Sequence, residues 1–166
     1  MSERRAPAAP AASVKAVRRF NLRSLSFGET SESLRDLFVD VEPFTLGGLE
    51  YDVEGGGVEL TLLVSRVGSR LTLRGTGAAV VVGPCQRCLE PARLEVALHC
   101  EDYVADGRSE GDDEPYVQGF VLDLQAWVRD ALAEALPTRV LCTLDCQGLC
   151  AVCGANLNVA GPDHAH

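Results

Sequence analysis

The sequence predicts an α+β fold: an antiparallel β-sheet or small barrel, one long helix near the C-terminus, and a cysteine-rich segment that forms zinc knuckles. Three observations predict it. Apolar and polar residues alternate between residues 39 and 100, apolar residues recur with helical spacing over residues 124–136, and six of the seven cysteines fall within residues 85–88 and 142–153.

The N-terminal part predicts a tail and two short elements. Residues 1–16 are rich in Ala, Pro and Arg, which predicts a disordered basic tail. Apolar residues between Phe20 and Phe27 predict a first strand that ends at Gly28. Residues 30–38 predict a short helix, because Ser and Thr can cap it and three apolar residues follow at i, i+3 and i+4.

Short strands are predicted from Val39 to Cys100. Alternating or β-branched runs mark residues 58–64, 70–74, 78–82 and 94–98, and glycines at 47–48, 55–57, 68 and 75–77 predict the turns between strands. Turns this closely spaced leave no room for crossover helices. The strands should therefore pair antiparallel.

The last elements are a loop, a strand and the helix. Residues 101–114 hold seven acidic residues and one arginine, without the spacing of an EF-hand, and predict an exposed loop. Residues 116–122 predict a strand. Asp123 can then cap a helix that ends before Pro137, with Trp127 on its apolar face. We expect one domain over residues 17–158 and a flexible C-terminus over residues 159–166.

The charge is unevenly distributed. The 166 residues carry a formal net charge of −9, yet six basic residues and one acidic residue precede Ser24. The rest of the chain has nine basic and 23 acidic residues, so an RNA-coating role of the body is disfavoured. Secretory and membrane-spanning patterns are both lacking, which predicts a cytoplasmic protein.

In a reducing compartment cysteines more often bind metal than form disulfides. The two C-x-x-C segments, Cys85/Cys88 and Cys150/Cys153, could together supply four thiolates, the ligand set of a structural Zn²⁺ site. Cys142 and Cys146 are alternates for the second pair. Cys100, on an alternating strand, is expected in the core.

Other chemistry has weaker support. Neither C-x-x-C segment opens a helix in a βαβ unit, so a thioredoxin-like redox role is disfavoured. Nucleotide-binding, serine-hydrolase and zinc-protease motifs do not occur. We expect no catalytic residue and no small-molecule substrate, and His164 and His166 are interpreted as chance residues of a polar terminus.

Three segments resemble a known family. They are Cys85-Gln-Arg-Cys88-Leu-Glu-Pro91, the helix from Asp123-Leu124 to Leu136-Pro137, and Cys146-Gln-Gly-Leu-Cys150-Ala-Val-Cys153-Gly-Ala-Asn156-Leu-Asn158. Together they are similar to the YceD family of bacterial and plastid proteins, over about residues 20–158. Some family members keep the first C-x-x-C segment and lack the second, which leaves the second ligand pair open.

The resemblance implies a non-enzymatic cytoplasmic factor that promotes accumulation of large-subunit ribosomal RNA. Its partners would be large-subunit ribosomal proteins or precursor rRNA, and Arg87 and Arg93 beside the first C-x-x-C segment are candidate contacts. Because the body is acidic, a basic protein partner is slightly favoured over RNA. The alternatives are a zinc- or thiol-dependent enzyme and a zinc-ribbon-like regulator.

Overall fold

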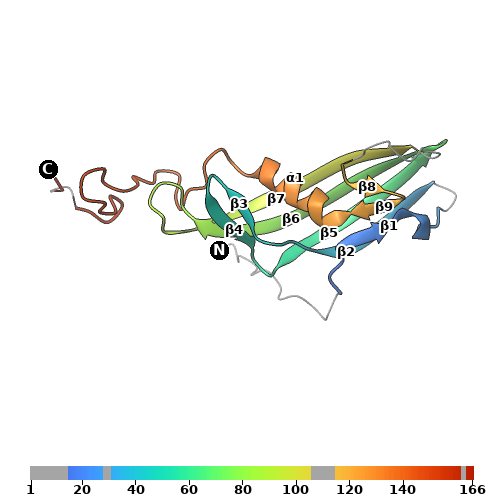
Figure 1. Ribbon diagram of the computed structural model, residues 1–166, viewed down its shortest axis with the longest axis horizontal. Coiled ribbons are helices and arrows are strands. Elements are labelled where there is room, and N and C mark those ends of the chain that lie inside the picture. Colours follow the sequence, from blue (N-terminus) through green and yellow to red (C-terminus); the bar gives the residue numbers. More distant parts are fainter. Residues whose placement is uncertain (1–14, 28–30, 106–114, 162–163) are drawn as a thin grey trace, which may run out of the picture.

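The computed structural model describes residues 15–27, 31–105, 115–161 and 164–166. Antiparallel sheets are the main regular structure among them, and one helix lies along the main sheet (Figure 1). The elements are β1 (Arg19–Asn21), the 3-10 turn η1 (Leu22–Ser24), β2 (Glu32–Asp40), β3 (Phe44–Leu46), β4 (Leu49–Val53), β5 (Gly57–Val67), β6 (Arg70–Pro84), β7 (Pro91–Ala105), β8 (Val117–Gln118), β9 (Val121–Asp123) and α1 (Leu124–Ala135). The predicted class, antiparallel sheet with a C-terminal helix, is confirmed; the alternative of a small barrel is not.

The main sheet is built on β6. Along one edge β6 pairs with β7 over its whole length, from Arg70 opposite Ala105 to Pro84 opposite Pro91. Along the other edge it pairs first with β5 and then, near its end, with β4. The β6–β7 hairpin is therefore the longest feature of the sheet, and its connecting loop is residues 85–90, which carry the first C-x-x-C segment.

A second, small sheet has the order β1, β9, β8. It ties the N-terminal segment to the residues that precede α1. The N–H of Val17 also donates to the carbonyl of Phe38 at 2.8 Å, and Arg18 forms ion pairs with Asp40 and Glu42. The N-terminal segment is thus fixed both to the main sheet and to the residues before α1.

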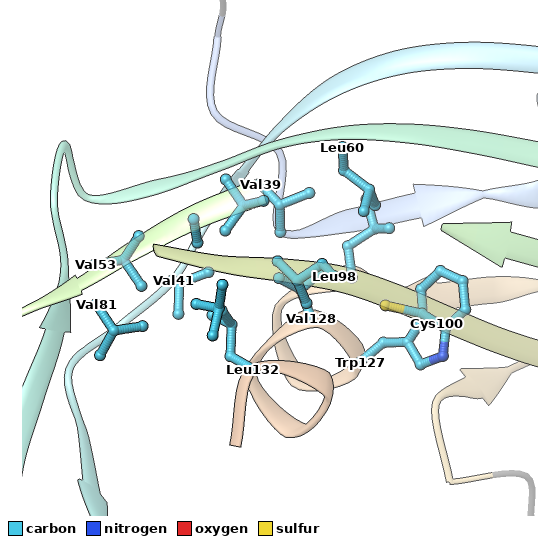
Figure 2. Packing of buried hydrophobic residues seen from close by; sticks show 14 of the residues in the cluster. Val39, Val41, Val53, Leu60, Val81, Leu98, Cys100, Trp127, Val128 and Leu132 are labelled. Carbon is cyan, nitrogen blue, oxygen red and sulfur yellow. The ribbon is translucent and has the colours of Figure 1, made fainter. Parts of the chain in front are cut away.

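Helix α1 supplies the other side of the core. The Asp123 side chain accepts a hydrogen bond from the N–H of Ala126 at 3.1 Å, the N-cap that the sequence predicts. Trp127, Val128 and Leu132 are buried against the sheet (Figure 2). Cys100 lies in the same core, 7% exposed, as expected from its alternating strand.

The predicted helix over residues 30–38 is wrong: residues 32–38 belong to β2, which pairs with β5. Leu34 lies opposite Leu63 and Leu37 lies opposite Leu60. The Leu34 side chain is nevertheless 56% exposed. The helical spacing of its apolar residues was a weak local signal. Backbone pairing with the long strand β5 overrides such local preferences.

The turn predicted at Gly75-Thr76-Gly77 is also wrong, because these residues lie inside β6. A Cβ atom on Gly75 would come within 3.2 Å of both Leu60 and the Trp127 ring. One on Gly77 would lie 2.5 Å from the carbonyl oxygen of Glu59. Glycine here allows close packing inside a strand rather than a change of chain direction.

Other segments differ in detail. Of the predicted acidic loop 101–114, residues 101–105 belong to β7, and residues 106–114 lie outside the described residues. The strand predicted at 116–122 is a tight hairpin of β8 and β9. Most of the predicted tail, residues 1–14, also lies outside the described part of the chain. Among the described residues, no helix has the length and apolarity to cross a membrane.

Replacing Trp127 with Ala tests the helix–sheet packing. We expect the free energy of unfolding to fall by about 3–5 kcal/mol, the usual cost of truncating a buried aromatic residue. Because Trp127 is the sole tryptophan, unfolding in urea should be followed by circular dichroism. Glu134→Ala, an exposed change on the same helix, should alter stability by less than about 0.5 kcal/mol. Equal effects of the two changes would contradict the packing.

Candidate metal centre

The β6–β7 loop folds into a tight turn, here called the first knuckle (residues 85–90). The N–H of Cys85 donates to the carbonyl of Glu90 at 2.7 Å, and the N–H of Leu89 donates to the carbonyl of Cys85 at 2.9 Å. Leu89 has a positive φ of 63°. The N–H of Arg87 points at the Cys85 sulfur, 3.5 Å away. The turn therefore brings both thiols to one side and offers a backbone donor to one of them.

Residues 150–155 repeat this turn and are called the second knuckle. The N–H of Cys150 donates to the carbonyl of Ala155 at 2.8 Å, and the N–H of Gly154 donates to the carbonyl of Cys150 at 2.8 Å. The N–H of Val152 lies 3.4 Å from the Cys150 sulfur, and Gly154 has a φ of 73°. The two C-x-x-C segments thus share one hydrogen-bond pattern, position by position.

Four thiols meet at the first knuckle. The sulfur atoms of Cys85, Cys88, Cys142 and Cys146 all lie within 4.8 Å of one another. Cys85 is 3.7 Å from Cys146, and Cys88 is 3.5 Å from Cys142. Three of the four residues are buried. We call this group the four-thiol cluster; it could hold a metal ion.

A backbone clamp carries the C-terminal segment to this cluster. The N–H of Gln86 donates to the carbonyl of Val140 at 2.8 Å, and the Gln86 side-chain oxygen accepts from the N–H of Val140 at 3.2 Å. Val140 is fully buried. Pro137 ends α1 just before this segment, so the chain leaves the helix and pairs with the hairpin loop. In Figure 1 the cysteine segment lies beyond the end of the main sheet, beside this loop.

Residues between and after the cysteines hold the C-terminal segment against the first knuckle. Gly148, with a φ of 79°, lies against the backbone of Arg87, where a Cβ atom would come within 3.2 Å of the Arg87 carbonyl oxygen. The N–H of Leu157 donates to the carbonyl of Gly148 at 2.9 Å. The Asn158 amide lies 3.4 Å from the Cys146 sulfur and donates to the Asn156 side chain at 2.8 Å. Asn158 thus joins the residues that follow the second knuckle to the four-thiol cluster.

The four thiols have unequal pKa values. Burial raises the pKa of Cys85, but backbone hydrogen bonds from Cys88, Arg87 and Cys142 outweigh it and lower this pKa to about 6. Burial, together with the neighbouring thiols, raises the pKa of Cys88 to about 12. The Asn158 amide likewise lowers the pKa of Cys146, whereas the pKa of Cys142 is raised. Two of the thiols therefore ionise more readily than the other two, since like charges this close repel. A bound divalent cation would stabilise all four thiolates.

The remaining predicted ligands lie elsewhere. The structure places Cys142 and Cys146, the predicted alternates, beside Cys85 and Cys88. Cys150 and Cys153 form a second group with His164 and His166, again with ligand atoms within 4.8 Å of one another. The ligands predicted from the sequence did not include His164 and His166. A signal was present, because both follow a C-x-x-C segment within 13 residues of Cys153.

The second group is the more exposed of the two. Cys153 and His166 are exposed, and Cys150 and His164 are partly buried. The His164 ring, followed by the backbone N–H groups of Cys153 and Val152, lowers the pKa of Cys150 to about 6. Burial, by contrast, raises the pKa of Cys100 to about 11, as befits a core thiol.

The two candidate contact arginines have different surroundings. Arg87 is exposed on the first knuckle. Arg93, on β7, forms ion pairs with Glu54 at 2.9 Å and with Glu95 at 3.4 Å. Its charge is therefore partly compensated within the chain, whereas Arg87 presents its side chain to solvent.

Comparisons with known proteins add the following. The profile of the family described as Large ribosomal RNA subunit accumulation protein YceD matches residues 73–166, which include both knuckles and α1. Uncharacterized proteins of Mycobacterium tuberculosis and Mycobacterium bovis are each 36% identical over 119 residues, 68% of this chain and 57% of theirs. One of Mycobacterium leprae is 33% identical over 118 residues, covering 68% and 54%. The chain thus spans just over half the length of these relatives. No solved structure matches.

Replacing Gln86 with Ala tests the clamp. The change leaves the buried N–H of Val140 without its side-chain acceptor, which should lower the free energy of unfolding by about 1–3 kcal/mol. Hydrogen exchange at the Val140 amide should also become faster. Gln118→Ala, an exposed change on β8, provides the control and should alter neither quantity. Unchanged exchange at Val140 in the Gln86→Ala protein would show that the clamp does not form.

Proposed function

Because this chain belongs to the YceD family of large ribosomal RNA subunit accumulation proteins, we propose that it is a non-enzymatic factor promoting large-subunit rRNA accumulation during ribosome biogenesis. The observation that carries the proposal is the family match over residues 73–166. The match covers both cysteine segments of the four-thiol cluster and helix α1, which lies between them in the sequence. A cytoplasmic location is part of the proposal, since ribosomes are assembled there in bacteria.

The cofactor that fits this role is a structural Zn²⁺ in the four-thiol cluster. Four thiolates in tetrahedral reach, supplied by two separate segments, are the usual ligand set of structural zinc. The ligands we propose are Cys85 and Cys88 with Cys142 and Cys146, in place of the second knuckle. Zinc there would hold the C-terminal segment on the β6–β7 hairpin and fix the surface that the two segments form.

The same ligand set argues against a catalytic metal. A catalytic zinc keeps one coordination position open for water or substrate. Four thiols within 4.8 Å of one another would fill every position of a tetrahedral ion. A zinc-dependent enzyme would also need a general base beside the metal. Among the described residues, the side chain outside the cluster that forms a hydrogen bond to one of its sulfurs is Asn158, whose amide is not a base.

The surface around the knuckles favours a protein partner. Five of the eight exposed large apolar side chains among the described residues lie in this region. They are Leu89, Leu144, Leu149, Val152 and Val159. Exposed apolar side chains that gather at one end often mark a binding surface. Together with the acidic body they suit a basic large-subunit ribosomal protein better than bare precursor rRNA, and exposed Arg87 would contact either partner.

Metal content tests the structural zinc. Cys85→Ser and Cys146→Ser, one from each segment, should each bind one zinc fewer than the wild type and should unfold at lower temperature, because metal-binding energy contributes to folding. Cys100→Ala removes a thiol outside the cluster and should retain all the metal. The measurements are elemental analysis and thermal unfolding with and without a chelator. Full metal content in Cys85→Ser would refute the site.

A depletion strain tests the ribosomal role. In the organism that encodes the chain, depletion should lower the large-subunit peak on a sucrose gradient and reduce large-subunit rRNA relative to small-subunit rRNA. Wild-type and Cys100→Ala proteins should restore both, and Cys85→Ser should not. Normal large-subunit levels after depletion would remove the ribosomal proposal while leaving the metal site intact. Rescue by Cys85→Ser would separate the metal site from the ribosomal role.

A further inference from the structure

We propose that Cys150, Cys153, His164 and His166 bind a second Zn²⁺, separate from the ion assigned to the four-thiol cluster. The ligand atoms of the four residues lie within 4.8 Å of one another, the spacing that a single tetrahedral ion requires. Two thiolates and two imidazoles are an established ligand combination for zinc. The inference goes beyond the proposed function, because a ribosomal factor needs no second metal.

The backbone of the second knuckle has the same geometry as that of the first. It has the same three hydrogen bonds as the first knuckle, with donor–acceptor distances of 2.8, 2.8 and 3.4 Å against 2.7, 2.9 and 3.5 Å. Both turns place a residue with positive φ four positions after the first cysteine, Leu89 in one and Gly154 in the other. If the first knuckle is built to hold two thiolates on one ion, the second is built in the same way.

The two histidines are the second argument. The Nε2 atom of His164 lies 3.7 Å from the Cys153 sulfur. The rings of His164 and His166 meet edge to face, with centroids 4.9 Å apart. The N–H of His164 donates to the carbonyl of Gly161 at 3.1 Å, which adds a backbone contact beside the ring. Both rings therefore converge on the thiols, in contrast to the chance placement expected from sequence.

Competition with the first cluster is excluded by geometry and ligand number. Cys85 and Cys88 already have Cys142 and Cys146 as neighbours, so a tetrahedral ion there has no position for Cys150 or Cys153. The second knuckle, in turn, needs two ligands from elsewhere, and the histidines supply them. Two thiolates and two neutral imidazoles also balance the charge of Zn²⁺, with release of the two thiol protons.

The two sites should differ in how firmly they hold metal. Cys85, Cys88 and Cys146 are buried, whereas Cys153 and His166 are exposed. Solvent and chelators therefore reach the second site more easily. We expect the second ion to leave first when a chelator is added, while the four-thiol cluster keeps its ion.

The test uses the full chain purified under reducing conditions and titrated with Zn²⁺ or Co²⁺ alone. The wild type should bind about two ions, and the double variant His164→Ala/His166→Ala should bind one. His99→Ala removes an exposed histidine in the middle of β7 that belongs to neither group, and this variant should bind two ions. The Co²⁺ spectrum of the double variant should retain the bands of a four-thiolate site and lose those of a mixed sulfur–nitrogen site.

Each result separates this inference from the structural zinc at the first knuckle. Cys85→Ser should lose the four-thiolate bands and keep the mixed-ligand bands, the reverse of the histidine variant. One ion in the wild type, or two in the histidine variant, would overturn the second site. A single ion lost equally in Cys85→Ser and Cys150→Ser would instead indicate one site shared by the two knuckles. The second site would also be overturned if thiol counting found a Cys150–Cys153 disulfide in the protein purified under reducing conditions.

Discussion

Repulsion among four sulfur atoms held within 4.8 Å of one another is the constraint on which the cysteine end of the molecule depends. Thiols this close cannot all ionise on their own, as the opposite pKa shifts of Cys85 and Cys88 illustrate. The surrounding chain supplies backbone N–H groups, the Gln86–Val140 clamp and the Asn158 amide to stabilise the arrangement. A bound divalent cation would stabilise all four sulfurs as thiolates.

The rest of the fold serves to bring these sulfurs together. Strand β6 extends for 15 residues and carries the first knuckle at the tip of its hairpin with β7. Helix α1 packs along the same sheet and ends at Ala135, so that the following residues start near that tip. The packing of Trp127 against Gly75 holds α1 on the sheet. It therefore determines where the helix ends relative to the hairpin loop that carries Cys85 and Cys88.

The function proposed for this chain would depend on the shape of one surface and not on a reaction. The four-thiol cluster has the ligand number of a closed site, and five of the eight exposed large apolar side chains of the described residues lie around it. The repeated knuckle geometry suggests that one turn is used twice, once with cysteines and once with histidines as partners. Two metal-stabilised turns would give a short segment without helix or strand a defined surface for a partner.

The sequence by itself determined the local features: antiparallel strands from alternation, α1 from its Asp123 cap and Pro137 stop, and two knuckles from C-x-x-C spacing. Such features depend on neighbours within a few residues. The tertiary structure alone decided that residues 32–40 form a strand, that Gly75 lies inside β6, and that Cys142 and Cys146 reach the first knuckle. The contacts between the two cysteine segments span 54–61 residues of chain. The pairing of β2 with β5 and of β6 with its neighbours is also set by residues outside the local segment, so no local pattern encodes these outcomes.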